Sequence, residues 1–492
     1  MVISGGRTPI WWADYGLGKR PRSKLWIGAP DPSLTGVSGM AAITELCEQL
    51  DVGGALDAAV GSIKQRARGH SAGQLLVGLA AAQLAGEDHL VGLDRHRADA
   101  AGQVLTPVAG LCSTTAAGLA RRITDGQWIR VETGVAAVTT RMLSWLPAPR
   151  RSALLAMVTI DLDTTDVEVY GRRKQGVAYN YQGQRCGRPH VATWAEADVA
   201  LAADLLAGNI DPRRGAPGLL RRALAALPKG VDRIQLRADG GYFAVDLAIA
   251  AHRAGITFAI GAKRIAALWR TLAGVTATDW VDAIDMAHAQ VTVADYGSAW
   301  WPTDTRLLIR RVRLDCDQIS TDPRARRRRT LHPDQRALPL DELAQADAVY
   351  GYSFILTNLD ASTPDKAAAV EHWYRHRTEI ENIFRDAKHG AALRHLPSGY
   401  AHVNRAWMWG ALIATSLAGW LHQLTADPDP GGGLLGWGVR DGKAMIATLR
   451  HRLICVPGRL IRHAGQLILR LPPGNHLLNE VLTRLRALPA AS

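Results

Sequence analysis

The chain has 492 residues, 47% of them apolar, which suffices for two or three domains with buried cores and excludes a disordered chain. Its formal net charge of +13 favours a polyanionic partner, most simply nucleic acid, although an Arg-rich composition alone would also give a basic chain. The five cysteines are far apart and form no CxxC pair, which argues against a disulfide frame or a zinc site and for a reducing compartment.

The sequence predicts a soluble, cytoplasmic protein without membrane contact. The opening residues "MVISGGRTPIWWADYG" lack the apolar run of a signal peptide. The most apolar stretch, residues 406–421, is shorter than the ~20 residues that a membrane span needs, and it contains Thr415 and Ser416. We therefore expect a buried core helix at this position.

An arm and a helical domain open the chain. Residues 1–38 carry Gly, Pro and basic residues with little periodicity, and residues 39–150 have an Ala- and Leu-rich helical pattern. Within the latter, "TPVAGLCSTTAAGLARRIT" resembles a helix-turn-helix in which Ser113 or Thr114 caps a second helix with a basic end. Any small helical bundle would show such a pattern, but the basic end suggests that this domain binds DNA ends.

The pattern changes to strands and helices in residues 151–264. "LLAMVTIDLD" and "DVEVYGRR" predict two strands with a short turn near Thr164 and Thr165, and "PHVATWAEA" predicts a third. A helix at "APGLLRRALAALP", a strand at "DRIQLRADGGYF", a helix at "AVDLAIAAHRAG" and a strand at "ITFAIGAKR" follow. This order is typical of an α/β layer with a mixed sheet.

The α/β pattern is interrupted once and then resumes. Residues 265–349 contain β-like runs and the Arg-rich "RARRRR", which indicates a β-rich insertion. Residues 350–426 bring back a strand, "YGYSFILTNL", and a helix that Thr363 caps. Residues 427–492 begin with the linker "DPDPGGG" and continue into a C-terminal region that is a candidate for dimerisation.

The helix that follows Thr363 carries a stripe of polar side chains. In "YRHRTEIENIFRDAK", a regular α-helix places Tyr374, Arg377, Glu381 and Lys388 within an arc of about 60°. The plain alternative is a solvated salt-bridge stripe, with Arg377 and Glu381 as an i,i+4 pair.

Carboxylates near two predicted strand ends help to decide whether this stripe is functional or only a row of solvated salt bridges. Asp161 and Asp163 share one face of the first strand, and Asp239 ends a later strand, followed by two glycines that permit close approach. A carboxylate inside an apolar strand is costly unless it is paired or bound to metal. Together with Glu381, these carboxylates could hold two Mg²⁺ ions about 4 Å apart, as in phosphoryl transfer, although each Asp alone reads as an ordinary strand-end residue.

These stretches together resemble a family. The helix matches the Y-(2)-R-(3)-E-(6)-K motif of DDE-type insertion-sequence transposases, and Asp163-Thr164-Thr165 and Asp239-Gly240-Gly241-Tyr242 match the two Asp motifs in order. The strings "DLDTTDVEVYGRRKQGVAYNYQG", "RADGGYF" and "AKR" are similar to one branch, the insertion-sequence thirteen-eighty group of the IS-four-like superfamily. The resemblance covers about residues 40–480 and implies an RNase H-like α/β core, interrupted by the β-rich insertion and preceded by an all-α N-terminal domain.

The resemblance also implies residue roles. Asp163, Asp239 and Glu381 would be the catalytic residues and metal ligands, with the motif register alone favouring Asp163 over Asp161. The DNA-binding residues would be Tyr374, Arg377 and Lys388, which grip phosphates beside the cut, Lys263 and Arg264 after a neighbouring strand, and Trp300 or Trp301, stacking on a flipped base.

The function implied is a DNA transposase that cleaves the ends of its element and joins them to target DNA. Two Mg²⁺ ions, for which Mn²⁺ would substitute, would be the cofactors. The partners would be double-stranded DNA, comprising terminal inverted repeats and target, and a second copy of the chain on paired ends. The superfamily analogy suggests a hairpin pathway in a prokaryotic, nucleoid-associated protein. The alternatives are a structure-selective nuclease on the same core and a catalytically silent DNA-binding derivative.

Overall fold

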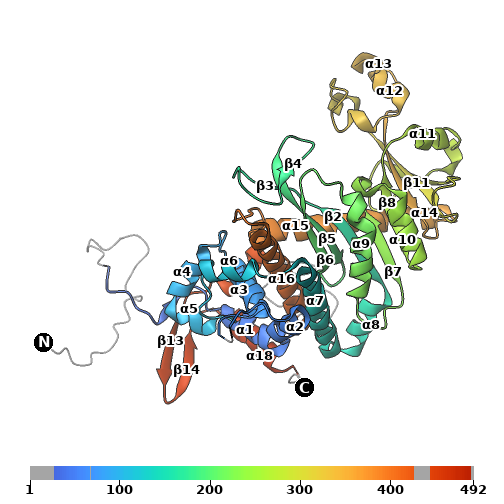
Figure 1. Cartoon of the computed structure of the whole chain (residues 1–492). Coiled ribbons are helices and arrows are strands. Elements are labelled where there is room, and N and C mark those ends of the chain that lie inside the picture. The colour runs from blue at the N-terminus through green and yellow to red at the C-terminus, as the bar shows by residue number, and fades with distance from the viewer. Residues whose placement is uncertain (1–26, 67, 426–443, 489–492) are drawn as a thin grey trace, which may run out of the picture. The chain divides into compact units, whose positions relative to one another are not determined.

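The computed structural model describes residues 27–66, 68–425 and 444–488. The chain divides into two compact units, Met1–Pro32 and Ser33–Ser492, and all described helices and strands belong to the second (Figure 1). Most of the arm expected over residues 1–38 lies outside the described residues, as does the linker expected at 427–433.

Helices precede the long sheet, as the Ala- and Leu-rich pattern predicts. They are α1 (Met40–Gln49), α2 (Val52–Val60), α3 (Ala72–Leu84), α4 (Gly92–Ala98), α5 (Ala100–Leu105), α6 (Ser113–Ala120), α7 (Asp125–Trp145) and α8 (Ala148–Ala156). Ser71 and Gln74 form a capping box at the start of α3, in which each side chain accepts a hydrogen bond from the other's backbone amide. Helix α3 is almost completely buried and therefore forms the centre of this helical region.

The expected mixed α/β core is present. Its strands are β2 (Val158–Thr164), β5 (Arg185–Trp194), β6 (Val199–Ala207), β7 (Ile234–Ala238) and β8 (Thr257–Ala262), with helices α9 (Pro212–Ala225) and α10 (Val245–Arg253) between them. Strand β5 runs antiparallel to β2 and β6, whereas β2, β7 and β8 are parallel neighbours. An antiparallel meander continued by two parallel strands is the RNase H-like arrangement. Strand β2 is buried over Val158–Leu162, as expected for a strand covered on both faces.

The β-like runs after residue 264 extend this same sheet. Strand β12 (Tyr350–Thr357) pairs with β8, and β11 (Arg306–Arg313), β10 (Ala289–Asp295) and β9 (Val281–Asp282) follow in antiparallel order, giving an 11-stranded sheet. Helices α11 (Ala266–Ala273), α12 (Pro333–Ala337) and α13 (Leu340–Ala344) lie outside the sheet. A small separate apolar cluster that includes Leu331 and Leu343 stabilises this outer region.

The helix predicted after Thr363 is not regular. Thr363 caps α14 (Pro364–Arg375) as expected, but a 3₁₀ turn (His376–Thr378) follows, then α15 (Glu379–Arg385) and a π-helical turn (Asp386–Gly390). The assumption of 100° per residue over the whole motif is therefore wrong, because the 3₁₀ and π turns change the angle between successive side chains.

The apolar stretch that the sequence assigns to a core helix forms α16 (Ala401–Thr425), which is buried over most of its length. It packs against α3 of the helical region, where Gln83 Nε2 donates to the carbonyl of Trp407 at 3.1 Å. It also packs against the sheet, where the Ala200 amide donates to Ser416 Oγ. Among the described residues no helix combines the length and the apolarity that crossing a membrane requires.

The described C-terminal residues return to the N-terminal helices. They form α17 (Ile446–Leu449), β13 (Gly458–His463), β14 (Gln466–Arg470) and α18 (Leu477–Arg486), and β13 pairs with β1 (Leu34–Thr35). Gly39 is required here, because a Cβ at this position would lie only 1.8 Å from the carbonyl oxygen of Leu453. The two ends of the second unit are therefore interlocked.

The short turn expected near Thr164 and Thr165 separates β2 from β3 (Val167–Glu168), and both strands pair with β5, which also pairs with β4 (Ala178–Tyr179). The expected helix cap was wrong. Helix α6 begins after Cys112 and has no capping hydrogen bond from Ser113 or Thr114. Ser113 turns back instead and donates its amide and hydroxyl to the Asp94 carboxylate.

A buried carboxylate joins the helical region to the sheet. Glu132 on α7 is only 4% exposed; its carboxylate accepts a hydrogen bond from the Ala203 amide at 3.2 Å and lies 3.2 Å from Arg222 Nε. Burial raises its pKa from 4.5 to about 7, although Arg222 and the Ala203 amide oppose this. A carboxyl group whose pKa is raised by folding contributes stability below its unfolded pKa, and that contribution is lost as the pH rises through the folded value.

We expect Glu132→Gln to make the protein less sensitive to pH between 5 and 8. The amide oxygen of Gln can still accept from Ala203, but it carries no charge to desolvate. Relative to the wild type, the variant should gain up to about 3 kcal/mol in the free energy of unfolding as the pH rises through this range. Denaturant titrations at pH 5, 6.5 and 8 measure this gain. If the free energies of unfolding of the variant and the wild type differ by the same amount at all three pH values, the pKa of Glu132 is not raised by folding.

Candidate active site

Two carboxylates meet at one edge of the sheet. Strands β2 and β7 are parallel neighbours, and Asp161 is the register partner of Arg237, so Asp163 and Asp239 each lie two residues further along adjacent strands. Asp239 accepts a hydrogen bond from the Gly241 amide at 2.8 Å and caps the 3₁₀ turn Gly240–Tyr242. The carboxyl ends of adjacent parallel strands thus bring together the two Asp residues that the sequence predicts.

The helical motif brings further charges to this edge. Helix α15 lies beside β2 (Figure 1), and Arg377, in the 3₁₀ turn before it, places Nη1 3.7 Å from Asp163 Oδ2. Burial opposes the charge of Arg377, yet its pKa is raised because Tyr374 and the carboxylates of Asp163, Asp239 and Glu381 face it. The charges of the three predicted carboxylates therefore all act on Arg377.

The protonation of Asp163 supports the same conclusion. Its pKa is raised to about 7, first by burial and then by the negative charge of Asp239, with a smaller effect from Glu381. The amide of Thr164 and the guanidinium of Arg377 oppose this rise. The three carboxylates thus share one electrostatic site, in which each disfavours the charge of the others.

The donor set fits a divalent cation. Three carboxylates supply the hard oxygen ligands that Mg²⁺ prefers, and a cation would relieve the repulsion around Asp163. Among the residues that the structure describes, no three His, Cys, Asp or Glu side chains already stand close enough to hold an ion as they are. Binding therefore requires side-chain movement, and the exposed side chain of Glu381 is the one with room to move.

The structure distinguishes the two Asp residues of β2, which the sequence left ambiguous. Asp161 is fully buried and accepts two hydrogen bonds from Arg237, at 2.7 and 2.8 Å, so its oxygens belong to a structural ion pair. Asp163 is partly exposed and faces Arg377 and Asp239. This geometry favours Asp163 as the ligand.

Tyr374 contacts the sheet. Its hydroxyl donates to the carbonyl of Ala238 at 3.0 Å, directly before Asp239, and burial raises its pKa to about 12. Gly261 on β8 makes this possible, because a Cβ there would lie 2.6 Å from the Tyr374 hydroxyl. In this structure Tyr374 anchors α14 against the end of β7. If Tyr374 also binds a phosphate, as the sequence predicts, its hydroxyl group must serve both contacts.

Lys388 lies apart from Arg377, in the π-helical turn. Its Nζ donates to the carbonyl of Asp166 at 2.8 Å, in the segment that follows β2. Asp166 in turn accepts from Arg188 Nε at 2.6 Å and from Asn180. Lys388 is therefore linked to the site indirectly, through the segment that follows β2.

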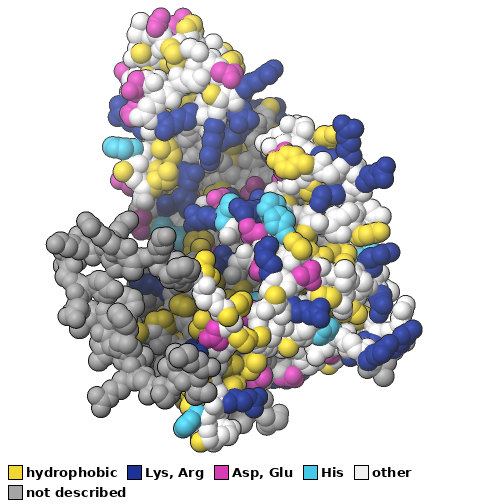
Figure 2. All heavy atoms as spheres, turned by 90° about the vertical axis from the view of Figure 1, so that its left-hand side faces the viewer, with side chains coloured by type: hydrophobic (Ala, Val, Ile, Leu, Met, Phe, Trp, Pro, Cys, Tyr) yellow, Lys and Arg dark blue, Asp and Glu magenta, His cyan; other side chains and the backbone are white. Residues whose placement is uncertain are grey.

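Lys263 and Arg264 follow β8 and are both exposed. Loss of hydration and the nearby charges of Arg329, Arg310 and Arg326 lower the pKa of Arg264. These arginines belong to β11 and to the outer region beyond it. Figure 2 shows Lys and Arg side chains gathered midway up the face that it draws. Strand β8 is the parallel neighbour of β7, with Ile260 the register partner of Ala238, so the basic residues after β8 lie beside the strand end that carries Asp239.

The two Trp candidates differ. Trp301 is 9% exposed and packs against Phe243, with ring centroids 5.7 Å apart, so it belongs to the core. Trp300 is 80% exposed. The geometry therefore leaves Trp300 as the candidate for base stacking.

Sequence reasoning missed two residues that shape the site. Arg237 organises the strands, and Arg310 pairs with the buried carboxylate of Glu371 at 2.6 Å while its charge also reaches Tyr374. The sequence contains enough information to find Arg237. A charged side chain inside an apolar strand needs a partner, and Asp161 on another apolar strand needs one of the opposite charge. No comparable signal exists for Arg310.

Comparison with known proteins assigns the family. The family model described as "Transposase DDE domain group 1" matches residues 31–320 and 342–490. The chain therefore belongs to the transposase DDE domain family. No curated protein sequence matches it.

One similar solved structure is a cryo-electron-microscopy structure of the piggyBac transposase synaptic complex with hairpin DNA. It is 10% identical, with a TM-score of 0.35, and the match covers 78% of this chain and 76% of that chain.

We expect Asp161→Asn and Asp163→Asn to affect stability in opposite ways. Asp161→Asn removes the carboxylate that binds Arg237 inside the core, which should cost about 3–5 kcal/mol. Asp163→Asn removes a charge that burial and Asp239 already disfavour, so above pH 7 it should leave stability unchanged or raise it. Urea denaturation of both variants tests this, and a larger loss for Asp163→Asn would reverse the assignment.

Proposed function

We propose that the protein is a DNA transposase that cleaves the ends of its own insertion sequence and joins them to target DNA. The observation that carries this proposal is that Asp163 and Asp239 lie at the ends of adjacent parallel strands of an RNase H-like sheet, with Arg377 3.7 Å from Asp163. The charge of Glu381 acts on both Asp163 and Arg377, which supports its place in the same site. Membership of the transposase DDE domain family supports the same chemistry.

The carboxylates would act as metal ligands. Domains of this family generally use divalent metal ions. Asp163, Asp239 and Glu381 would hold two Mg²⁺ ions, for which Mn²⁺ would substitute, and the ions would activate the attacking oxygen and stabilise the leaving one. Arg377 neutralises part of the carboxylate charge and is positioned to donate to a phosphate that enters the site.

The surrounding residues would hold and orient the DNA. Lys263 and Arg264 offer exposed cations beside the site, and Trp300 offers an exposed aromatic face for a displaced base. Lys388 would bind phosphate after exchanging its contact with the Asp166 carbonyl, and Tyr374 would set the position of α14.

We further propose that the protein belongs to the insertion-sequence thirteen-eighty group. The strings "DLDTTDVEVYGRRKQGVAYNYQG", "RADGGYF" and "AKR" support this assignment. The DNA partners would be the terminal inverted repeats and a target duplex. Two ends require two active sites, so the working form would be a homodimer.

The competing function is a structure-selective nuclease on the same core. A nuclease releases DNA ends but does not join them, so a strand-transfer assay distinguishes the two. A silent DNA-binding derivative is disfavoured because all three carboxylates and Arg377 are present and share one electrostatic environment.

Replacement of any one carboxylate by Ala should abolish cleavage while DNA binding persists, because binding depends mainly on phosphate charge. The substrate is duplex DNA that carries the inverted repeats flanking the coding sequence. Glu381→Gln should bind as tightly as the wild type or slightly tighter, because it removes a negative charge near the phosphates. Asp365→Asn, an exposed carboxylate at the other end of α14, is the control and should cleave normally. Undiminished cleavage in excess chelator would overturn the metal mechanism.

Arg377→Gln and Lys263→Gln should each weaken DNA binding in a salt-dependent way. If each side chain contacts one phosphate, the slope of log affinity against log salt should fall by about one for each variant. Lys229→Gln is the matched control, since Lys229 is exposed and precedes β7, at the end of that strand opposite to Asp239. Equal slopes for all three variants would remove Arg377 and Lys263 from the DNA interface.

A further inference from the structure

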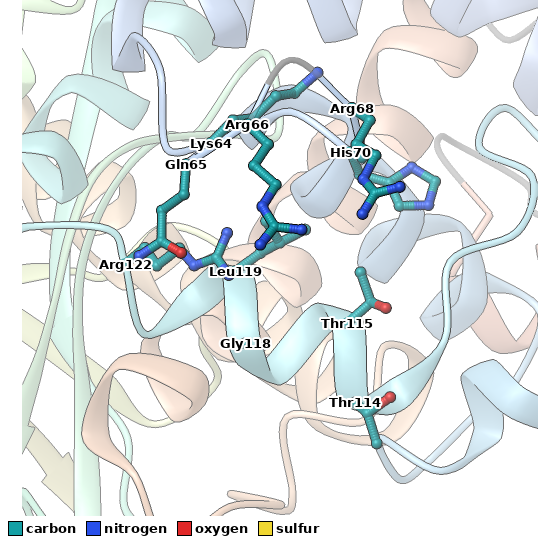
Figure 3. A pocket seen from close by; sticks show the side chains of 11 residues that line it. Lys64, Gln65, Arg66, Arg68, His70, Thr114, Thr115, Gly118, Leu119 and Arg122 are labelled. Atoms are coloured by element: carbon teal, nitrogen blue, oxygen red, sulfur yellow. The ribbon is translucent and has the colours of Figure 1, made fainter.

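A second basic site lies in the N-terminal helical region. A cleft of about 600 Å³ separates α6 from the segment that carries Lys64, Arg66, Arg68 and His70. Figure 3 shows the guanidinium groups of Arg66 and Arg68 reaching toward α6, with Arg122 at the end of that helix. Among the described residues that line the cleft there is no carboxylate.

The cations of the cleft lack counter-charges. Within the described ranges none of Lys64, Arg66, Arg68 and Arg122 takes part in an ion pair, whereas most acidic residues of this helical region are already engaged, for example Asp94 with Ser113. Like charges that gather without partners repel one another, so the arrangement is stabilised when an anion enters.

The opposite wall suits a bulky, extended anion. Thr114 and Thr115 line the cleft, and their hydroxyl groups also lie 3.4 and 3.0 Å from Cys112 Sγ, a contact that a ligand would replace. A Cβ built at Gly118 would meet no atom within 4 Å, so α6 is open on this side. The other side of α6 is buried through Ala116 and Ala120. A broad cleft with several separate cations and small polar side chains fits a chain of phosphates better than a single one, which would need convergent donors.

The cleft is also fixed relative to the sheet. The guanidinium of Arg121, at the end of α6, lies 4.2 Å from the ring centre of Tyr400, just before α16. Trp128 Nε1 donates to His402 on α16 at 3.1 Å. Because α16 packs against β6, a ligand in the cleft is held in a defined position with respect to the carboxylates.

We propose that this cleft binds the sugar–phosphate backbone of duplex DNA at a distance from the carboxylate site. Arg66, Arg68 and Arg122 contact phosphates, and Thr114 and Thr115 donate hydroxyl hydrogen bonds to the same strand. The proposal rests on the proposed function, in that the DNA bound here is the DNA that the carboxylate site cleaves. It assigns the cleft a part in holding that DNA.

The test is DNA binding by the full-length protein without divalent metal, so that cleavage does not contribute. The probe is a labelled 30-base-pair duplex, titrated at several salt concentrations. The triple variant Arg66→Gln, Arg68→Gln and Arg122→Gln should bind at least tenfold more weakly than the wild type near 150 mM salt, and its salt slope should fall by about two to three. Its melting temperature should not fall, because the three side chains form no ion pair and their removal relieves mutual repulsion.

A matched triple variant controls for net charge. Arg130→Gln, Lys229→Gln and Arg253→Gln remove the same charge from exposed positions that do not line the cleft, and this variant should keep the wild-type slope. If the cleft variant behaves like the control while the wild type binds DNA, the inference fails and the proposed function stands. If the wild type binds no DNA, both fail. Loss of binding to an RNA duplex alone would assign the cleft to RNA and overturn the proposal.

Discussion

The buried ion pair between Asp161 and Arg237 sets the geometry on which the carboxylate site depends. It links β2 and β7 two residues before Asp163 and Asp239, and its two hydrogen bonds hold the strands in the register that places those carboxylates side by side. Arg237 also donates to the carbonyl of Trp373 at 2.9 Å, near the end of α14. A well-packed apolar pair could stabilise the strands equally well, but it could not also bind α14, which leads through the 3₁₀ turn into α15 with Glu381. One guanidinium thus orients all three elements.

The irregular helix gives each motif residue a different target. On a regular helix the four residues would form one stripe, but here Tyr374 reaches the end of β7, Arg377 faces Asp163, and Lys388 reaches the segment after β2. The π-helical turn that carries Lys388 is held by Asp386, whose buried carboxylate accepts from the Ile446 amide at 2.7 Å. Such turns occur frequently at functional sites, because they let one helix serve several partners at the cost of regular hydrogen bonding.

The sequence was sufficient for the order of strands and helices, for the mixed α/β class and for the buried core helix at 406–421, because these follow from local periodicity. It could not settle Asp161 against Asp163, since both lie on one strand face and only the partner strand supplies Arg237. The missing cap at Ser113 has a similar cause, because Asp94 captures the hydroxyl that a local rule assigns to the helix. The basic cleft was missed because Arg66 and Arg122 meet only after folding.

Two groups of basic side chains lie in places that the fold holds at a fixed separation. One is the cluster around Arg264 next to the carboxylates, and the other is the cleft over α6. Repulsion within each group opposes folding, and the cost is met by packing elsewhere, above all by α16, which joins the helical region to the sheet. A rigid connection has a mechanical consequence. DNA that occupies both basic sites is aligned with the carboxylates by the geometry that the free protein already has. No binding energy is then spent on moving domains. That energy remains available to orient the phosphate at the cleavage site.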